Sequence, residues 1–319
     1  MTLPNSLSSA IDAIASSFRL KDLILFSQEV TEKYRQGASL SRAEHLLSYL
    51  IARMPATFAV QKKIFSELTF HINSKEIETL LDVGAGPGTA LWASEEALPY
   101  LSHVTLLERE KKFIAIAQQL LGARETSLPF SCEWKCQNIL EDLPIFPFDL
   151  VLASYVLGEI PEEKRPFLIE ELWKKTRRCL VVIEPGTPEG FLRVKKTRDQ
   201  LLLHGASIFA PCPHALECPL VGGQAWCHFS VRLSRSALHR RIKRAELSFE
   251  DEKFSYMIFS KTPTPHRFSR VLHHPRKQSG RLGIVLCTER GIESKTIFKK
   301  EKEKYDLAKK LEWGDKLIF

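Results

Sequence analysis

The fold is predicted by one stretch of the sequence, Thr79-Leu80-Leu81-Asp82-Val83-Gly84-Ala85-Gly86-Pro87-Gly88-Thr89-Ala90. An apolar run ends in the acidic residue Asp82, three glycines follow at intervals of two residues, and a helix-like segment begins near Thr89. The run is typical of a buried parallel strand, and the glycines let the backbone turn tightly and come close to a ligand. Because the free N–H groups of the helix point at the same turn, the stretch predicts a loop that holds a nucleotide-like cofactor in an α/β sheet.

The spacing of Gly84, Gly86 and Gly88 distinguishes this turn from two other glycine loops. The third glycine comes one position too early for the dinucleotide fingerprint Gly-x-Gly-x-x-Gly, and no Gly-Lys-Ser/Thr follows as in a phosphate loop. Asp-x-Gly-x-Gly-x-Gly instead resembles motif I of the class I S-adenosylmethionine-dependent methyltransferases. The resemblance implies S-adenosylmethionine as the cofactor, with Asp82 either facing its ammonium group or holding the loop.

Two further residues follow the next strands of the expected sheet. Glu108 lies twenty residues past Gly88, at the end of the second strand, where a carboxylate can accept hydrogen bonds from both hydroxyl groups of a ribose. Asn138 closes the third strand, where its amide can bind the adenine edge. These positions fall at the carboxyl ends of strands, the edge at which open α/β sheets bind ligands. A solvated charge at a strand end is the alternative interpretation of Glu108.

The segment expected to meet a methyl acceptor contains no known acceptor motif. Ala153 to Pro161 lacks the Asn/Asp-Pro-Pro-aromatic loop of enzymes that methylate exocyclic amines, and no cysteine lies in the Pro-Cys loop of cytosine-C5 enzymes. Glu159 and Glu184 are each interpreted as either a base or a residue that orders a loop. No general base, and therefore no catalytic residue, can be named from the sequence.

Four cysteines form the second candidate site. Three lie close together in Cys212-Pro213-His214, Cys218-Pro219 and Trp226-Cys227-His228, and Cys287 ends a later predicted strand. By ligand type, four thiolates suit zinc or an iron–sulfur cluster equally. The spacing differs from the Cys-x-x-Cys pairs of zinc ribbons, which favours the cluster. The two histidines are possible substitute ligands or hydrogen-bond donors to the ligands, and the remaining cysteines are interpreted as inert core residues: Cys132, Cys136 and Cys179.

The periodicity of the chain divides it into four regions: a helical N-terminal region (1–74), a methyltransferase core (75–204), a cysteine-rich loop (205–230), and late strands with a basic C-terminal part (231–319). Ser41-Arg42-Ala43-Glu44 has the form of a capping box. The helix that it opens is expected to end at Arg53-Met54-Pro55, and another is expected over Val60–Phe70. The loop over 205–230 is rich in Pro, Gly and Cys and without periodicity, which is typical of a functional loop.

Strands and helices alternate in the core, as in a doubly wound α/β sheet. After the first strand, further strands are predicted at Val104–Leu107, Phe130–Lys135, Phe148–Ala153 and Cys179–Glu184. Helices are predicted at Arg109–Leu121, Glu162–Thr176 and Phe191–His204. Late strands of the same sheet are expected at Phe254–Ser260 and Leu282–Leu286.

The composition is that of a soluble globular protein. The chain is 44% apolar and 26% charged. Its 319 residues are enough for two or three domains. No apolar run approaches the roughly 20 residues that span a bilayer, and Met1 to Leu20 lacks the early basic cluster of a secretory signal. We therefore expect a cytoplasmic protein without membrane contact, whose seven cysteines are thiols or metal ligands rather than disulfides.

Charge is concentrated at the C-terminal end. Residues 231–319 contain 22 Lys+Arg and 11 Asp+Glu, a net charge of +11, which leaves 24 and 27, or −3, for residues 1–230. This asymmetry suggests a polyanionic partner, nucleic acid before membrane; a solvated basic surface is the alternative. Two clusters are candidates for RNA contact: the helix face with Arg193, Lys195, Lys196 and Arg198, and the segment with Arg240, Arg241, Lys243 and Arg244.

Over nearly its whole length, the sequence resembles the ribosome-associated, methyltransferase-like proteins of the small ribosomal subunit found in bacteria and mitochondria. Besides the glycine turn and the four cysteines, the resemblance is carried by three segments: Ala52-Arg53-Met54-Pro55-Ala56-Thr57-Phe58-Ala59, Ile183-Glu184-Pro185-Gly186-Thr187-Pro188 and Trp313-Gly314-Asp315. It implies a methyltransferase fold that binds small-subunit ribosomal RNA during assembly or translation. It further implies a four-iron four-sulfur cluster whose ligands are Cys212, Cys218, Cys227 and Cys287.

The leading hypothesis is S-adenosylmethionine-dependent methyl transfer connected with small-subunit ribosomal RNA. A non-catalytic assembly factor that keeps the fold, the cluster and the basic surface is the first alternative. A radical enzyme is the second, although the Cys-x-x-x-Cys-x-x-Cys loop of that chemistry is absent. The sequence indicates no target nucleotide and no oligomeric state.

Overall fold

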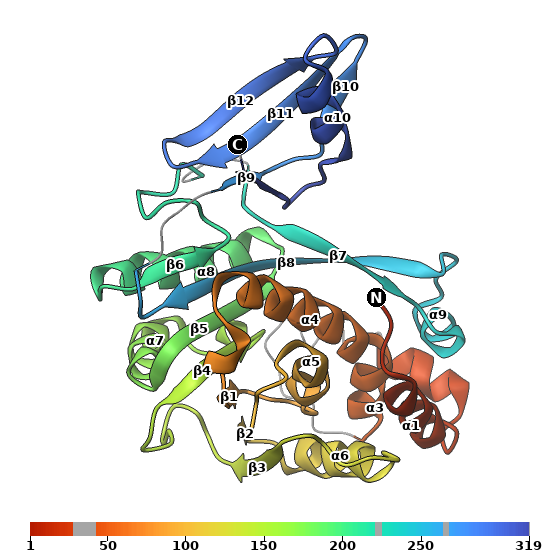
Figure 1. Ribbon diagram of the computed structural model, residues 1–319. Coiled ribbons are helices and arrows are strands. Elements are labelled where there is room, and N and C mark those ends of the chain that lie inside the picture. The colour runs from red at the N-terminus through yellow and green to blue at the C-terminus, as the bar shows by residue number, and fades with distance from the viewer. Residues whose placement is uncertain (28–42, 221–224, 264–267, 319) are drawn as a thin grey trace. The chain divides into compact units, whose positions relative to one another are not determined.

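A computed structural model describes residues 1–27, 43–220, 225–263 and 268–318 (Figure 1). The chain divides into two compact units, each assembled from two stretches of sequence. Unit 1 comprises Met1–Arg177 and Val231–Glu252, and unit 2 comprises Arg178–Ser230 and Lys253–Phe319. The boundaries of the four sequence regions therefore do not coincide with those of the two units.

Unit 1 contains four parallel strands in the order β3-β2-β1-β4. Their bounds are Thr79–Val83 for β1, His103–Glu108 for β2, Ser131–Cys136 for β3 and Phe148–Ser154 for β4. All four strands predicted for this part of the chain are confirmed. Val83, the last residue of β1, pairs with Leu107 on one side and Ala153 on the other, so the glycine turn begins beside the end of β2.

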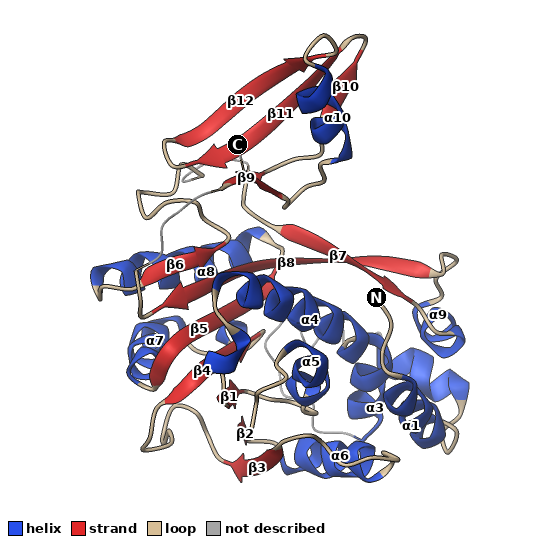
Figure 2. Ribbon diagram, viewed as in Figure 1, coloured by secondary structure: helices blue, strands red, loops and turns tan. Residues whose placement is uncertain are grey.

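Helices of unit 1 surround these strands (Figure 2). Their bounds are Asn5–Ala15 (α1), Ala43–Ala52 (α3), Met54–His71 (α4), Thr89–Ala97 (α5), Lys111–Gly122 (α6), Arg165–Lys174 (α7) and Ala237–Lys243 (α9), and short 3₁₀ turns lie at Ser74–Glu76, Leu157–Glu159 and Glu162–Lys164. The helix break predicted near Pro55 is confirmed, but the start expected at Val60 is wrong. The next helix begins at Met54, because proline is tolerated in a first turn, where its missing N–H would have no partner. Ser41 and Arg42 of the proposed capping box lie outside the described residues.

Unit 2 contains a mixed set of strands. β8 (Phe249–Ser260) runs between β5 (Thr176–Pro185) and β6 (Ser207–Ala210) and is antiparallel to both. α8 spans Pro188–Leu203, and β7 (Phe229–Ser234) also pairs with β8. Residues 231–234 of β7 and 249–252 of β8 belong to unit 1. One prediction is corrected: the segment 205–230 is not an unbroken loop, because it contains β6 and the start of β7.

A second, five-stranded sheet lies in unit 2, in the order β10-β11-β9-β13 with β12 paired to β11. Its bounds are Ser269–Val271 (β9), Arg276–Gln278 (β10), Arg281–Thr288 (β11), Gly291–Phe298 (β12) and Lys316–Leu317 (β13), and α10 spans Lys302–Lys310. The strand expected at Leu282–Leu286 is present, but its assignment to the main sheet is wrong. β11 buries alternate residues on one face only, as strands of a half-covered antiparallel sheet do. Among the described residues, no helix is long and apolar enough to cross a membrane.

Candidate cofactor and metal sites

The glycine turn follows β1, and its backbone is fixed by the neighbouring strand. The N–H groups of Gly84 and Ala85 both donate to the Leu107 carbonyl oxygen at 2.9 Å. Gly86 has a φ of +55°, and a Cβ added there would meet nothing nearer than the Tyr49 hydroxyl, at 3.9 Å. Glycine is therefore required by the backbone conformation, and the space beside Gly86 is open to a ligand.

Glu108 lies at this turn, as predicted. Its two carboxylate oxygens accept the N–H groups of Gly86 and Glu110, each at 2.8 Å. Burial raises the pKa of Glu108, and the two backbone hydrogen bonds offset part of that rise. Because a carboxylate has about four acceptor positions, the group keeps acceptor capacity for ligand hydroxyls.

Asp82 supplies a second buried carboxyl group at the end of β1. Only 2% of the residue is exposed. Burial, followed by repulsion from the Glu108 charge, raises the pKa of Asp82 to about 7. A cationic ligand placed beside the two acidic groups would relieve both effects.

Asn138 makes local contacts instead. Its Oδ1 accepts the Leu140 N–H at 3.1 Å and its Nδ2 donates to Glu141 at 3.0 Å, so the side chain closes a turn after β3. Trp134 is a neighbour that sequence reasoning missed: a Cβ on Gly88 would lie 3.0 Å from its Cζ2, and its buried Nε1 has no hydrogen-bond partner among the described residues. A tryptophan in an otherwise polar strand was the available signal.

Both glutamates considered as bases are engaged in ion pairs. Glu159 lies 3.4 Å from the Arg109 guanidinium, and the fully buried Glu184 accepts a hydrogen bond from Arg193 at 2.5 Å. A neighbouring guanidinium stabilises the charged form of a carboxylate, and such an ion pair can hold a loop in place. These contacts favour the loop-ordering interpretation of both residues.

The basic face predicted on α8 is wrong for three of its four residues. Arg193 is paired with Glu184, Lys195 contacts Asp199 at 2.5 Å, and Arg198 is 2% exposed. These three charges thus have partners within unit 2 or are buried there, whereas Lys196 is exposed.

The four candidate ligands Cys212, Cys218, Cys227 and Cys287 line one cavity of 40 Å³ in unit 2, called here the cysteine cavity. All seven cysteines of the chain are free thiols. Burial, followed by the proximity of the other three thiols, raises the pKa of Cys227 well above its usual value. For Cys287, burial together with Cys212 and Cys218 raises the pKa to about 12. The structure therefore brings together residues that are up to 75 positions apart in the sequence.

Two buried arginines hold the chain around the cysteine cavity. Arg198 donates to the carbonyl oxygens of His214 and Leu216, at 3.2 and 2.6 Å, within the loop that links the first two cysteines. Arg270 donates to those of Pro211 and Gly314, at 3.1 and 2.8 Å. Both arginines line the cavity. Neither was predicted from the sequence to belong to this site.

The thiols surround the cavity without converging on one point. Among the described residues, no three or more Cys, His, Asp or Glu side chains have the arrangement needed for a metal ion. His214 Nε2 lies 3.5 Å from the Cys287 sulfur, whereas His228 stacks on Trp226 at 5.3 Å and meets the Trp313 ring at 4.3 Å. His214 is thus next to the thiols and His228 belongs to an aromatic wall.

The three other cysteines differ in burial. Cys179 is buried and Cys132 is half-buried, as expected of core residues, but Cys136 is exposed. Its thiol lies 3.6 Å from the Arg109 carbonyl oxygen. Interpretation of Cys136 as a buried core residue is therefore wrong.

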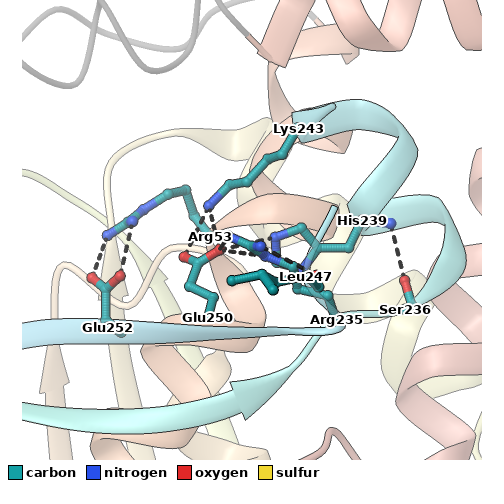
Figure 3. A network of polar contacts seen from close by, with 8 residues as sticks. All are labelled: Arg53, Arg235, Ser236, His239, Lys243, Leu247, Glu250 and Glu252. Carbon is teal, nitrogen blue, oxygen red and sulfur yellow. Dashed lines mark hydrogen bonds and ion pairs between the residues drawn. The ribbon is translucent and has the colours of Figure 1, made fainter. Parts of the chain in front are cut away.

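A charged network in unit 1 accounts for part of the basic segment near residue 240 (Figure 3). Glu250 on β8 accepts hydrogen bonds from Arg235 at 2.8 Å and from Lys243 at 2.9 Å, with His239 Nε2 at 3.6 Å. Burial alone would raise the pKa of Glu250, but the His239 hydrogen bond and the charge of Lys243 outweigh it, so the pKa lies well below its usual range. Lys243 is consequently neutralised inside the unit, while Arg240 and Arg241 are exposed.

These observations define the class of protein. A parallel β3-β2-β1-β4 order, a glycine turn whose N–H meets an acidic residue at the end of β2, and an antiparallel β8 between β5 and β6 are the features of a class I S-adenosylmethionine-dependent methyltransferase fold. Residues 43–318 match the family described as mitochondrial small ribosomal subunit Rsm22. The chain belongs to this family.

Two curated relatives illustrate its range. The ribosome assembly protein METTL17, mitochondrial, of Homo sapiens is 27% identical over 317 residues, with 94% of this chain and 68% of the relative covered. The Rsm22-cox11 tandem protein 2, mitochondrial, of Schizosaccharomyces pombe is 27% identical over 326 residues, and the match covers 85% of this chain but 42% of that protein. The match thus spans less than half of the tandem protein.

Solved structures with similar chains are more distant. Magnesium protoporphyrin IX methyltransferase from Synechocystis PCC 6803 with bound SAH has a TM-score of 0.42 at 13% identity, covering 74% of this chain and 96% of that one. A putative RNA methyltransferase from Pyrococcus horikoshii has a TM-score of 0.38 at 16% identity, covering 63% and 81%. With TM-scores below 0.5, these matches assign neither substrate nor activity.

Proposed function

We propose that this chain is an S-adenosylmethionine-dependent, methyltransferase-like protein that acts on or with the ribosomal RNA of the small subunit during ribosome assembly or translation. The observation that carries the proposal is the hydrogen bond between the Gly86 N–H and the Glu108 carboxylate, found in a member of a small-subunit ribosomal protein family. The name of the human relative favours assembly as the process.

The glycine turn fits S-adenosylmethionine as the cofactor. The open side of Gly86 admits a ligand close to the backbone, and Glu108 keeps acceptor positions for the ribose hydroxyls. The acidic pair of Asp82 and Glu108 suits a cofactor with positively charged sulfonium and ammonium groups. When bound, the cofactor would supply an activated methyl group. We assign its binding to Asp82, Gly84, Gly86, Gly88 and Glu108, with Asn138 contributing only after release of its local turn.

The cysteine cavity fits an iron–sulfur cluster better than a single zinc ion. Zinc needs its four ligands at about 2.0–2.3 Å from one point, whereas these thiols stand around a cavity. In a cluster, each thiolate binds a different iron atom, so wider spacing is suitable. The positive charges of Arg198 and Arg270 would offset the net negative charge of a cluster with four thiolates. We propose Cys212, Cys218, Cys227 and Cys287 as the ligands of a four-iron four-sulfur cluster, with zinc as the alternative.

A non-catalytic assembly factor is the second candidate. It is favoured by the ion pairs that engage Glu159 and Glu184, which leave no identified general base. Correct positioning can carry much of a methyl transfer, so the missing base alone does not decide between the two. In the non-catalytic reading, a bound cofactor would stabilise the fold by mass action.

The proposed partner is the small ribosomal subunit and its RNA, without membrane contact. Localisation should follow that of the ribosome concerned. The cytoplasmic location expected from the sequence stays a prediction, and the mitochondrial names of the relatives make the mitochondrion the alternative.

Replacement of Gly86 by Asp tests the cofactor and the activity together. The new side chain would occupy the open side of the turn and add a negative charge beside Glu108 and Asp82. In calorimetry, S-adenosylmethionine should bind the wild-type protein and show no measurable binding to Gly86→Asp. Gly205→Asp is the matched control, because Gly205 has a similar φ of +76° with open space around it and lies outside the turn.

The same variants separate the enzyme from the assembly factor in cells. If the protein is an enzyme, cells with Gly86→Asp as their only copy lose a methyl mark on small-subunit RNA that the Gly205→Asp cells keep. Normal marks and normal subunits with a folded Gly86→Asp protein would leave the assembly factor as the function.

A further inference from the structure

The small sheet of unit 2 has one covered and one open face (Figure 1). α10 packs on the covered face, where Leu282, Ile284 and Leu286 of β11 form a buried cluster with Ile297 of β12. The strand alternation places the residues between them on the opposite face. The basic helix α10 thus covers the apolar face of this sheet.

The open face is defined by the strand register. Its cross-strand pairs are Arg281–Phe298, Gly283–Thr296, Val285–Ser294 and Cys287–Ile292 between β11 and β12, with Arg276 and Gln278 on β10. Phe298 is 44% exposed and Ile292 is 41% exposed. These two side chains add apolar surface to a face that otherwise presents polar and basic groups.

The charge of the open face has one sign. Arg276 and Arg281 are exposed and form no ion pair with a carboxylate among the described residues, and the register places no acidic side chain on the face. Lys300 lies 5.7 Å from the centre of the Phe298 ring. The Glu301 carboxylate, which is close by, is engaged by the Phe298 backbone N–H at 2.8 Å. Arg281, which lies opposite Phe298 in the register, donates to the Gln278 amide oxygen at 2.5 Å and so keeps its full charge. A face with an aromatic ring and basic side chains suits a ligand that is both aromatic and anionic.

We propose that the open face of β10, β11 and β12 binds a single-stranded segment of RNA. Phe298 stacks on a base, Arg276 and Arg281 contact phosphates, and the hydroxyl groups of Thr296 and Ser294 are available to the sugar. A duplex would present its phosphates but not the faces of its bases, so the aromatic contact selects single strands. The inference rests on the proposed function, since it names the surface through which RNA is bound.

One end of the face adjoins the cysteine cavity. Cys287 and its cross-strand partner Ile292 both line that cavity. The strand that offers Arg281 to RNA therefore also carries a proposed cluster ligand. A ligand bound by Cys287 would fix the register of β11 and β12, and with it the spacing of Phe298 and Arg281.

Binding of a labelled single-stranded RNA to the purified full-length chain tests the proposal. Phe298→Leu, which keeps apolar volume without an aromatic plane, should weaken binding by at least about fivefold, and Phe298→Tyr should bind as the wild type does. The double variant Arg276→Glu/Arg281→Glu should lower the slope of log affinity against log salt by about 1.4, or 0.7 for each phosphate contact. The matched control is Lys304→Glu/Lys309→Glu on α10, which makes the same charge change on the covered side of the sheet and should affect binding less.

The outcomes separate this inference from the proposed function. If the wild-type chain binds RNA and the open-face variants bind as tightly as the α10 control, the surface is wrong while RNA binding stands. If the chain binds no RNA in any form, the proposed function is wrong, and the RNA-binding surface is wrong with it. Equal weakening of single-stranded and duplex RNA by Phe298→Leu overturns the stacking contact, and displacement of the RNA by polyglutamate as readily as by unlabelled RNA would point to an acidic protein instead.

Discussion

The glycine turn and the cysteine cavity are built in opposite ways. At the turn, a contiguous motif places three glycines beside two buried acidic residues, and backbone N–H groups already hold Glu108. At the cavity, thiols from distant parts of the chain are held by two buried arginines. One site is local and acidic, and the other is assembled by the fold and basic.

This difference indicates what each site contributes to stability. The turn is fixed by hydrogen bonds within the protein, so unit 1 should keep its fold without a ligand. The cavity leaves four thiols around an opening, and its walls depend on contacts between separate segments of unit 2. Since ligand binding energy at such a site is folding energy, the stability of unit 2 should depend on the proposed cluster much more than that of unit 1 depends on S-adenosylmethionine.

The largest expected effect is that of Cys218→Ser. Loss of one ligand should abolish the cluster and destabilise unit 2 by several kcal/mol, while unit 1 keeps its structure. Iron and sulfide content after anaerobic purification, followed by thermal unfolding, measures both effects. Cys136→Ser, which changes an exposed thiol outside the cavity, is the control. Stoichiometric zinc in place of iron in the wild-type protein would assign the site to zinc, and a Cys218→Ser protein that retains all its iron would remove Cys218 from the ligands.

The next largest effect on stability is expected for Asp82→Asn. This variant should raise the free energy of unfolding, whereas Cys218→Ser should lower it. The folded-state pKa of about 7 is above the ordinary 3.8, so the folded chain keeps a proton that the unfolded chain loses as pH rises between these values. The free energy of unfolding therefore falls over this window and stays low above it. Asn cannot titrate, and at pH 8 without cofactor the variant should be more stable than the wild type by about 2–4 kcal/mol. Denaturant unfolding at pH 4 and pH 8 measures the difference.

Asp149→Asn provides the reverse control within unit 1. Burial opposes the charged form of Asp149, but hydrogen bonds from Arg177 and Thr79 outweigh it and lower the pKa. Its contribution is thus present above the unfolded-state pKa and lost as pH falls through the folded one, so Asp149→Asn should destabilise the protein at neutral pH. Equal stability curves for Asp82→Asn and the wild type would show that the acidic turn carries no electrostatic cost.

The contrast between the sites also explains what could be predicted from the sequence. Strands β1, β2 and β4 and the positions of Gly86 and Glu108 were predicted, because a buried parallel strand is a continuous apolar run and the motif is contiguous. The four cysteines could be grouped by residue type alone. Their arginine neighbours were not predicted, because counting charges treats every arginine as a surface residue.

Arg198 did carry a signal. It lies seven residues after Phe191 and three before Leu201, in phase with the buried face of α8. An arginine on an apolar face is rarely buried without hydrogen-bond partners. Here Nη2 donates to two loop carbonyl oxygens, while Nε has no partner among the described residues. The small sheet was missed for a different reason: β10 is wholly exposed and β12 is exposed over most of its length. Polar strands whose partners are provided by tertiary pairing have no apolar run to reveal them.

A smaller effect is expected for Glu108→Gln. The amide keeps the size of the side chain but removes the charge that accepts the ribose hydroxyls, so affinity for S-adenosylmethionine should fall by about 1.5–3 kcal/mol. Calorimetry measures it, with thermal unfolding to show that the turn persists without the charged acceptor for the Gly86 N–H. Glu110→Gln, two residues along the chain, is the control, because the hydrogen bond from Glu110 to Glu108 is donated by its backbone N–H and is kept in the variant. Unchanged affinity would mean that Glu108 only holds the turn and that the acidic site is structural.

The smallest effect is expected for charge reversal on α9, and it asks whether unit 1 shares in RNA binding at all. Arg240 and Arg241 are exposed without an ion pair among the described residues, whereas Lys243 is held by Glu250. Arg240→Glu/Arg241→Glu should therefore lower the salt slope of RNA binding by at most about 1.4.

Lys243→Gln distinguishes charge available to RNA from charge used inside unit 1. It should leave RNA affinity unchanged and destabilise the unit, because Glu250 loses a buried cationic partner. RNA titrations at several salt concentrations, with unfolding curves for both variants, provide the comparison. If the Arg240→Glu/Arg241→Glu variant keeps the wild-type slope, α9 is only a solvated surface, and RNA binding belongs to unit 2 beside the cysteine cavity. If Lys243→Gln lowers the slope as much as the arginine pair does, the ion pair with Glu250 opens on binding and unit 1 contributes directly.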